Sequence, residues 1–353
     1  MKKSIKICIT FLVLAAFIVT IGVGCKITTT NTTTAAETTA AETTKAAETT
    51  TTAATTTVAG KPMEGWTVGY LPGALIDVLR KTWSDVMIKT IEDAGGKVIT
   101  IDSQNDATKQ VSDGEDILQQ DIKLLIINPN DADAMVPIIK KANEKGIPVI
   151  CIDRAASGGT IVTTVEFDNY KAGFEAGKFI AETNNKKGKV MQIQGTSGAS
   201  VVYERGQSFR DAIKQYPEMK IVDEPFSKGW TGEDGLAFTE DILRANPDLI
   251  GIWTHADAMA VGAYQAVLAA GKLDQVTIVG MGFYGGMPEL IKEGKSKKLY
   301  TWALLPDEVG KAAGEVAIKI AMGKTAEIKA ITATPIIWIT PENVDKNWEL
   351  RLQ

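Results

Sequence analysis

The sequence predicts an α/β fold of two similar halves, each a parallel β-sheet with helices on both faces. Short apolar runs alternate with longer amphipathic stretches of helical period along most of the chain, which is typical of βαβ units. The same rhythm begins again after residue 168. About 290 residues follow the N-terminal segments, enough chain for two domains with separate cores.

The first half contains five predicted strands and three predicted helices. The strands are short apolar runs, at 66–70, 97–101, 123–128, 148–152 and 160–167. The amphipathic stretches between them predict helices over 76–94, 107–120 and 132–145.

The second half repeats this pattern. Its predicted strands lie at 188–195, 219–226, 249–254 and 276–281, and its predicted helices at 200–215, 232–245 and 258–270. Asp131 and Asp257 each precede a helical stretch. We expect both carboxylates to act as N-caps.

The N-terminus has the layout of a secretory signal, because lysines precede a long apolar run that ends in small residues and Cys25. Residues 1–24 resemble a bacterial lipoprotein signal, although Gly22 stands where that pattern favours an aliphatic residue. The resemblance implies cleavage before Cys25, a lipid on that cysteine, and attachment to the extracytoplasmic face of the cell membrane. An uncleaved membrane anchor is the alternative, since the apolar run approaches the length that spans a bilayer.

Residues 25–61 are rich in threonine and alanine, and "AAETT" occurs three times within them. Such a segment has too few large apolar groups to form a core, so we expect a disordered tether. Cys8 belongs to the signal and Cys25 to the lipid, which leaves Cys151 alone and excludes an intramolecular disulfide. The chain has 38 basic and 43 acidic residues, a net charge of −5, which argues against a nucleic acid partner.

The sequence lacks the usual groups of an active site. His255 is the only histidine, and there is no nucleophile elbow, no pair of cysteines and no phosphate-binding loop. We therefore expect no enzyme, no metal and no cofactor. In parallel α/β sheets, ligands bind at the carboxyl ends of strands, and Asp153 and Arg154 follow a strand directly.

Four stretches indicate a family: "INPNDADAMVPIIKKANEKGIPVICIDRAASGG", "VVYERGQSFRDAI", "ILRANPDLIGIWTHADAMAVGAYQAV" and "ITPENVD". From about Trp66 onward they resemble the ribose- and galactose-binding branch of the type I periplasmic binding proteins, which serve bacterial ABC importers. The resemblance implies two Rossmann-like lobes joined by three crossovers, near 167–168, 303–305 and 332–334. One lobe would comprise 62–167 with 305–331, and the other 168–304 with 332–353.

The resemblance also implies the ligand contacts. Asp153 and Arg154 would face a cleft from the first lobe, and Arg205 and Trp230 from the second. A carboxylate that accepts and a guanidinium that donates suit a polyol, because each hydroxyl both donates and accepts. The alternatives are an ion pair at a strand end for Asp153 and Arg154, and packing between the lobes for Trp230.

Several positions depart from the usual sugar-binding pattern. Ala256 replaces an asparagine, Gly282 followed by Phe283 replaces an aspartate, and Leu304 replaces a glutamine. A looser alignment places Asp77, Leu79 and Arg80 opposite an asparagine and two phenylalanines. Either His255, Arg80, Asp77 and backbone groups supply other hydrogen bonds, or the ligand has fewer hydroxyls and more apolar surface. Trp253 and Trp302 flank the substituted positions. A place at the ligand for these two rings would favour the second explanation, but we expect core packing for both.

The sequence thus predicts a monomeric receptor that delivers a sugar, polyol or related hydroxylated molecule to a membrane permease. A non-sugar ligand, such as an autoinducer-type furanosyl signal or a nucleoside, is one alternative. A sensory protein that serves a chemoreceptor or kinase is another.

Overall fold

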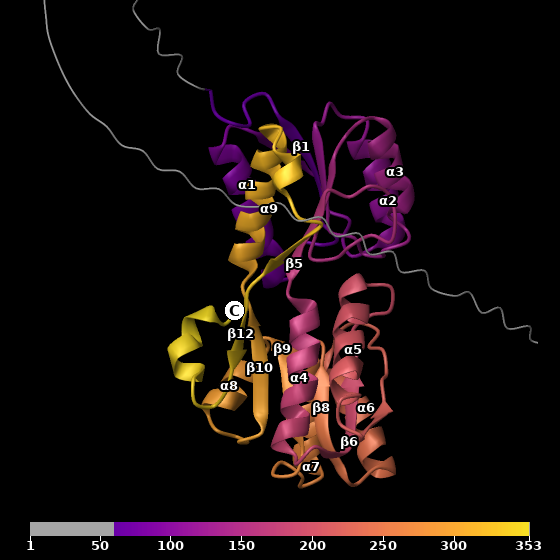
Figure 1. Cartoon of the computed structure of the whole chain (residues 1–353), viewed down its shortest axis with the longest axis vertical. Helices are drawn as coiled ribbons and strands as arrows, with labels where there is room; N and C mark the ends of the chain where they lie inside the picture. The colour runs from indigo at the N-terminus through magenta and orange to yellow at the C-terminus, as the bar shows by residue number, and fades with distance from the viewer. Residues whose placement is uncertain (1–59, 353) are drawn as a thin grey trace, which may run out of the picture. The chain divides into compact units, whose positions relative to one another are not determined.

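The computed structural model describes residues 60–352. The predicted signal over 1–24, Cys25 and most of the predicted tether therefore lie outside the described residues. Within the described part, the strands form two six-stranded sheets, each flanked by helices (Figure 1). We call each sheet with its helices a lobe.

The first lobe holds a sheet whose strands are all parallel, in the order β11-β5-β4-β3-β1-β2. The strands are β1 Thr67–Leu71, β2 Lys97–Thr100, β3 Leu124–Ile127, β4 Val149–Ile152, β5 Thr163–Phe167 and β11 Ile331–Thr334. Its helices are α1 Val78–Asp93, α2 Ala107–Ile117, α3 Val136–Glu144 and α9 Pro306–Ala321. Strands β3 and β4 are buried throughout, because helices cover both faces of this sheet.

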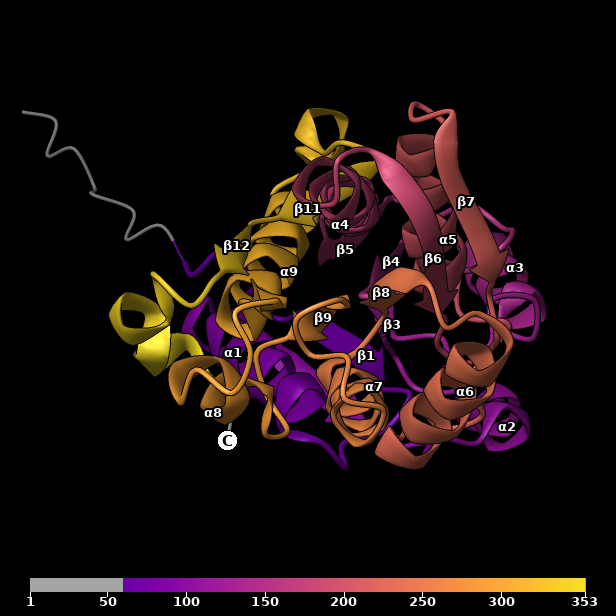
Figure 2. The ribbon, with the colours of Figure 1, turned by 90° about the horizontal axis from the view of Figure 1, so that it is seen from below.

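The second lobe has the strand order β12-β10-β9-β8-β6-β7, and only β12 is antiparallel to its neighbour. Its strands are β6 Lys187–Ile193, β7 Glu218–Asp223, β8 Leu249–Thr254, β9 Thr277–Gly282, β10 Leu299–Leu304 and β12 Ile336–Ile339. Its helices are α4 Asn169–Thr183, α5 Ser200–Ile213, α6 Gly232–Ala245, α7 Asp257–Ala269 and α8 Met287–Lys292. Figure 2 shows α4 and α5 on one face of this sheet and α6 and α7 on the other. The predicted fold class is therefore confirmed.

The chain passes between the lobes at three places. The first lies between β5 and α4, at Asp168, and the second between β10 and α9, at Leu305. The third lies at Pro335, between β11 and β12. This position directly follows the expected range, 332–334. The expected boundary of the first lobe, after residue 331, is three residues too early, because Ile331–Thr334 pair in parallel with Thr164–Phe167 of the first sheet.

Neither predicted N-cap occupies that position. Asp131 accepts hydrogen bonds from the backbone N–H groups of Asp133 and Ala134 at 3.0 and 2.8 Å, so it caps a turn that precedes α3. Helix α3 accordingly begins at Val136, four residues after the start that the sequence predicts for the helix over 132–145. Asp257 is the first residue of α7 itself, and its buried carboxylate binds groups on other strands.

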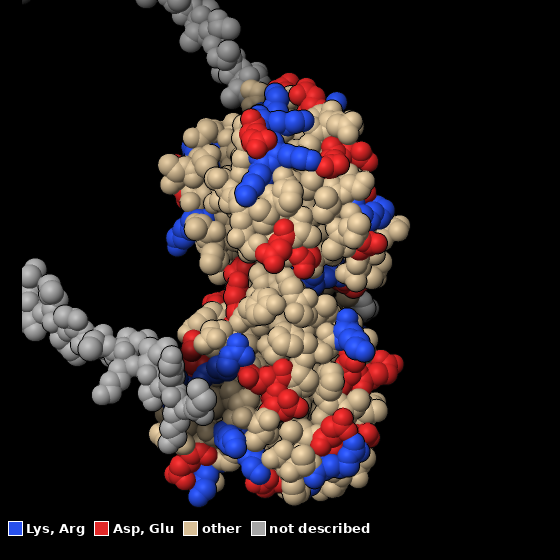
Figure 3. Space-filling view, turned by 90° about the vertical axis from the view of Figure 1, so that its right-hand side faces the viewer, with Lys and Arg blue, Asp and Glu red and all other residues tan. Residues whose placement is uncertain are grey.

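Charges of both signs intermingle on the face shown in Figure 3. Among residues 60–352, no helix has the length and apolarity needed to cross a bilayer. Cys151 is a free, buried thiol within that part of the chain. Burial raises its pKa to about 12, so the thiol stays protonated and unreactive.

Helices α4 and α5 pack unusually closely where Gly173 faces α5. A Cβ atom at Gly173 would lie 2.2 Å from the carbonyl oxygen of Arg205 and 2.3 Å from the hydroxyl of Ser208. This close approach brings Arg205 against Asn169, the first residue of α4. The glycine thus positions a side chain of the site described below.

We expect Gly173→Ala to destabilise the protein by about 1–3 kcal/mol, because α4 and α5 must move apart. Urea unfolding measures this loss. Gly158→Ala is the matched control, since its Cβ atom would make only an ordinary 3.4 Å contact with Val136. Equal stability of the two variants would contradict the packing argument.

Candidate ligand-binding site

A cavity of about 610 Å³ lies where the carboxyl ends of strands from both lobes meet. In the first sheet β1 lies between β2 and β3, and in the second β6 lies between β7 and β8. Ligands of open α/β sheets bind at such points, where the strand order reverses. The topology therefore explains why the loops of both lobes line one cavity.

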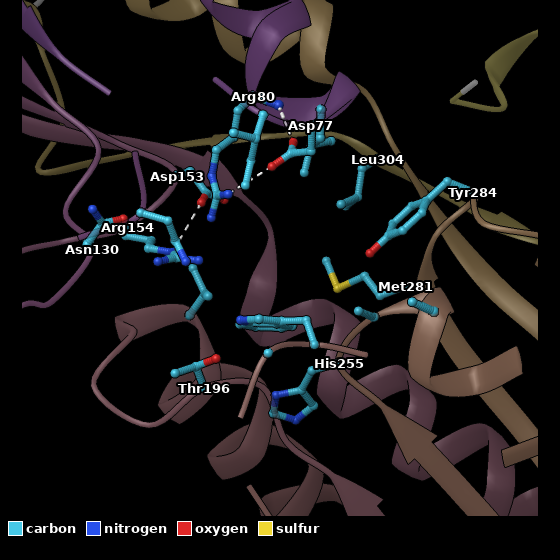
Figure 4. A pocket seen from close by; sticks show the side chains of 18 of the residues that line it. Asp77, Arg80, Asn130, Asp153, Arg154, Thr196, His255, Met281, Tyr284 and Leu304 are labelled. Carbon is cyan, nitrogen blue, oxygen red and sulfur yellow. Dashed lines mark hydrogen bonds and ion pairs between the residues drawn. The ribbon is translucent and has the colours of Figure 1, made fainter. Parts of the chain in front are cut away.

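Ten of the twelve predicted ligand contacts line this cavity. They are Asp77, Leu79, Arg80, Asp153, Arg154, Arg205, Trp230, His255, Ala256 and Leu304. Figure 4 shows Asp77, Arg80, Asp153 and Arg154 on the first lobe's side. Gly282 and Phe283 do not belong to the lining.

Phe283 lies in the core of the second lobe, where its side chain is fully buried and its ring is 6.4 Å from that of Trp348. Tyr284 lines the cavity instead. Gly282 has a φ of +138°, and a Cβ atom there would lie 2.0 Å from the Tyr284 ring. Glycine at 282 therefore leaves space that the ring of Tyr284 fills, which is why the expectation for Gly282 and Phe283 is wrong.

The Asp257 carboxylate holds this turn in place. It accepts hydrogen bonds from the N–H groups of Phe283 at 2.5 Å and Tyr284 at 3.1 Å, and from the Thr301 hydroxyl at 2.6 Å. Burial raises the pKa of Asp257 to about 7, although the hydrogen bonds that its carboxylate accepts act to lower this pKa. The orientation of Tyr284 thus depends on a residue outside the cavity.

Asp153 and Arg154 form the polar end of the first lobe's wall. Both are buried, and the Nε atom of Arg154 lies 3.6 Å from the Asp153 carboxylate. Asp153 has a φ of +63°, a conformation that aspartate tolerates better than most residues. Burial, and then the neighbouring Arg80, lower the pKa of Arg154 to about 10. The guanidinium still remains charged at neutral pH.

Asp77 and Arg80 lie beside this pair at the start of α1. Asp77 is the N-cap, and its carboxylate accepts from the backbone N–H of Arg80 and from the Arg80 guanidinium, both at 2.8 Å. The contact orients the guanidinium toward Asp153, as Figure 4 shows. Asn130, which follows β3, lines the same end and was missed by the sequence reasoning.

Arg205 enters the cavity from α5 of the second lobe. Its Nε donates to the Asn169 side chain and one terminal nitrogen to the carbonyl oxygen of His255, both at 2.8 Å. Burial lowers the pKa of Arg205, while the negative charge of Asp153 on the facing wall acts to raise it. These two bonds hold the guanidinium at the boundary between the lobes.

His255 is almost fully buried, with Nε2 3.2 Å from the side-chain oxygen of Gln192. Burial, together with Arg205, lowers its pKa well below the usual value, so the imidazole is neutral at pH 7. Trp253 is fully buried in the core, and the Trp302 indole donates to the carbonyl oxygen of Ala172. Neither tryptophan lines the cavity, as expected.

Contacts between the lobes close the cavity at one side. The backbone N–H of Ala155 donates to the Ser200 hydroxyl at 2.8 Å, and that of Ala132 donates to the carbonyl oxygen of Gly198 at 3.3 Å. Residues from both lobes thus touch beside the site. No local sequence pattern predicts these contacts, because they join segments that are far apart in the chain.

Two carboxyl groups also meet across the lobes. Glu166 of β5 is buried, and it lies close enough to Glu204 of α5 for each carboxyl group to affect the pKa of the other. Burial, and then the charge of Glu204, raise the pKa of Glu166 to about 8, and burial raises the pKa of Glu204. The pair therefore holds a proton at neutral pH.

The sequence reasoning also missed Met281, Tyr284 and Thr196 in the lining. Each lies in or next to a loop that follows a strand, but the loop position alone does not say which side chain faces the cavity. Within residues 60–352, no cluster of three or more His, Cys, Asp or Glu side chains is arranged to hold a metal ion.

The chain belongs to the periplasmic binding protein domain family, which matches it over residues 68–325. This is a family of solute-binding proteins and not of enzymes. The fold and the position of the cavity agree with that membership.

Individual relatives support the same assignment. A ribose import binding protein of Bacillus subtilis is 38% identical over 245 residues, which are 69% of this chain and 78% of that protein. The structure of a periplasmic ribose ABC transporter protein from Conexibacter woesei superposes with a TM-score of 0.74 and 25% identity, covering 84% of this chain and all of that one. A fructose-binding periplasmic domain of a hybrid two-component system has a TM-score of 0.71 and 26% identity, covering 80% and 92%.

Proposed function

We propose that the protein is an extracytoplasmic receptor that captures a sugar, polyol or related hydroxylated molecule for an ABC importer. The observation that carries this proposal is the position of Asp153, Arg154 and Arg205, which converge on one cavity from both lobes. Charged donors and acceptors match hydroxyl groups, and hydrogen bonds to charged groups contribute roughly 1.5–3 kcal/mol each. The import function of the Bacillus subtilis relative supports the same role.

Ligand capture would couple to closure of the lobes. Asp153 and Arg154 would hold the ligand on the first lobe, while Arg205 and Trp230 would bind it from the second. A ligand that contacts both lobes binds the closed form better than an open one, and so shifts the population toward closure. The chain segments at Asp168, Leu305 and Pro335 would serve as the hinge, and the closed monomer would dock on a permease.

A thermal-shift screen of the intact chain against pentoses, hexoses, polyols and nucleosides tests the proposal. A ligand that binds only the native state raises Tm by an amount that grows with the logarithm of its concentration relative to Kd. We expect at least one hydroxylated compound to raise Tm. No response to any compound would refute the proposed ligand class, whereas a response only to nucleosides or furanosyl signals would favour the non-sugar alternative.

A sensory role is the second candidate, and the similarity to a periplasmic domain of a hybrid two-component system supports it. The same closed form could be recognised by a membrane kinase. Uptake of the ligand in cells that lack the protein separates the two roles. Lost uptake is expected for an importer, and unchanged uptake with lost signalling for a sensor.

We further propose that Cys25 carries a lipid and that residues 25–61 tether the lobes to the outer face of the membrane. The support is the order of lysines, apolar run and cysteine at the N-terminus. Mass spectrometry of the mature N-terminus should find a diacylated Cys25. An intact Met1 with an unmodified cysteine would favour the uncleaved anchor.

A further inference from the structure

The two ends of the cavity differ in chemistry. Figure 4 shows Asn130, Asp153 and Arg154 at one end and Met281, Tyr284 and Leu304 at the other. The first group offers an amide, a carboxylate and a guanidinium. In the second, only the Tyr284 hydroxyl can form a hydrogen bond of ordinary strength. Ala256, on the same lobe as Met281, adds a further apolar contact.

This separation constrains where hydroxyl groups can bind. A hydroxyl buried against Leu304, Met281 and Ala256 would lose its hydrogen bonds to water and find only the Tyr284 hydroxyl in their place. The same hydroxyl beside Asp153 and Arg154 would find both an acceptor and donors. A ligand with hydroxyls on every side, such as a free hexose, therefore matches only one end of the cavity.

We propose that the ligand is a sugar ring that carries an apolar or aromatic substituent, as in a glycoside or a nucleoside. The ring binds at Asp153 and Arg154, and the substituent packs against Leu304 and Met281. Trp230 lines the space between the lobes and offers a flat apolar face to either part. For a glycoside, this inference rests on the proposed function and specifies its ligand class; for a nucleoside, it coincides with the alternative ligand stated there.

Calorimetric titration of the intact chain tests it with matched probes: D-ribose, D-galactose and D-glucose, the methyl and phenyl glycosides of each, and adenosine. We expect at least one phenyl glycoside or the nucleoside to bind at least tenfold more tightly than its parent sugar, because a buried ring gains in proportion to its apolar area. Free sugars that bind as tightly as every derivative would overturn the inference and leave the proposed function standing. No binding by any probe would overturn the inference, and the thermal-shift screen, which includes polyols, then decides whether the proposed function also fails.

Substitution at the apolar end locates the substituent. Leu304→Gln should reduce the preference for the derivative over its parent sugar at least fivefold, since the amide must lose water when the substituent binds. Met281→Gln makes the same test if Leu304→Gln does not fold. Leu268→Gln is the matched control, because Leu268 is exposed on α7 outside the cavity. An unchanged preference in both cavity variants would show that the substituent does not bind there, and would overturn the proposal.

Discussion

Arg154→Ala should weaken ligand binding at least a hundredfold. The substitution removes the ligand's contacts with a charged donor, which contribute roughly 1.5–3 kcal/mol each, and tenfold in Kd corresponds to about 1.4 kcal/mol. It also leaves the Asp153 carboxylate buried without its neighbouring charge. Calorimetric titration with the tightest-binding compound of the thermal-shift screen measures the loss.

Two further variants make this experiment specific. Arg154→Lys keeps the charge but loses the planar fork of donors, so its affinity should lie between those of the wild type and the alanine variant. Arg244→Ala is the control, because that side chain is 71% exposed and paired with Asp241 on α6, away from the cavity. Affinity of Arg154→Ala within threefold of the wild type would mean that the pair with Asp153 is only structural.

The second large effect concerns pH and the Glu166–Glu204 pair. Because folding raises the pKa of Glu166 from 4.5 to about 8, the folded state binds more protons than the unfolded state between these values. The stability that comes from this group is complete below pH 4.5 and is lost as the pH rises through about 8. One pKa unit corresponds to about 1.4 kcal/mol, so the loss is on the order of a few kcal/mol.

Urea unfolding of the intact chain between pH 5 and pH 9 measures this slope. Glu166→Gln cannot ionise, so we expect its free energy of unfolding to decrease less with rising pH than that of the wild type. Asp257, whose pKa is raised to about 7, contributes a slope of the same sign in both proteins. Glu218→Gln serves as the control, since that carboxylate is exposed beside Lys187. Parallel curves for wild type and Glu166→Gln would contradict the shared proton.

The alternation of apolar runs and helical stretches was enough to predict nine strands, β1 to β9, and the helices α1, α2, α3, α5, α6 and α7, but it did not predict α4, α8, α9 or β10 to β12. Runs such as Leu124–Ile127 and Val149–Ile152 are apolar at every position because helices cover both faces of their sheet, and that pattern is visible in a single sequence. The same reasoning placed Asp153 and Arg154 at the cavity, since they directly follow a strand that ends at the shared edge, whereas His255 and Ala256 were expected there from the family resemblance.

Other features depended on contacts between distant segments. The positive φ of Gly282 and the Asp257 carboxylate of α7 together decide which residue of the turn 282–284 faces the cavity. The position of the third passage between the lobes depends on the pairing of β11 with β5, and no local sequence pattern predicts that pairing.

By itself, the sequence determined which segments form strands and helices and which loops gather at the ligand, because these depend on side-chain period and strand ends. Only the tertiary structure decided the chemistry of the facing wall and the meeting of Glu166 with Glu204. Those features follow from side-chain direction and from the approach of residues far apart in the chain, and both are set by the packing of the whole domain.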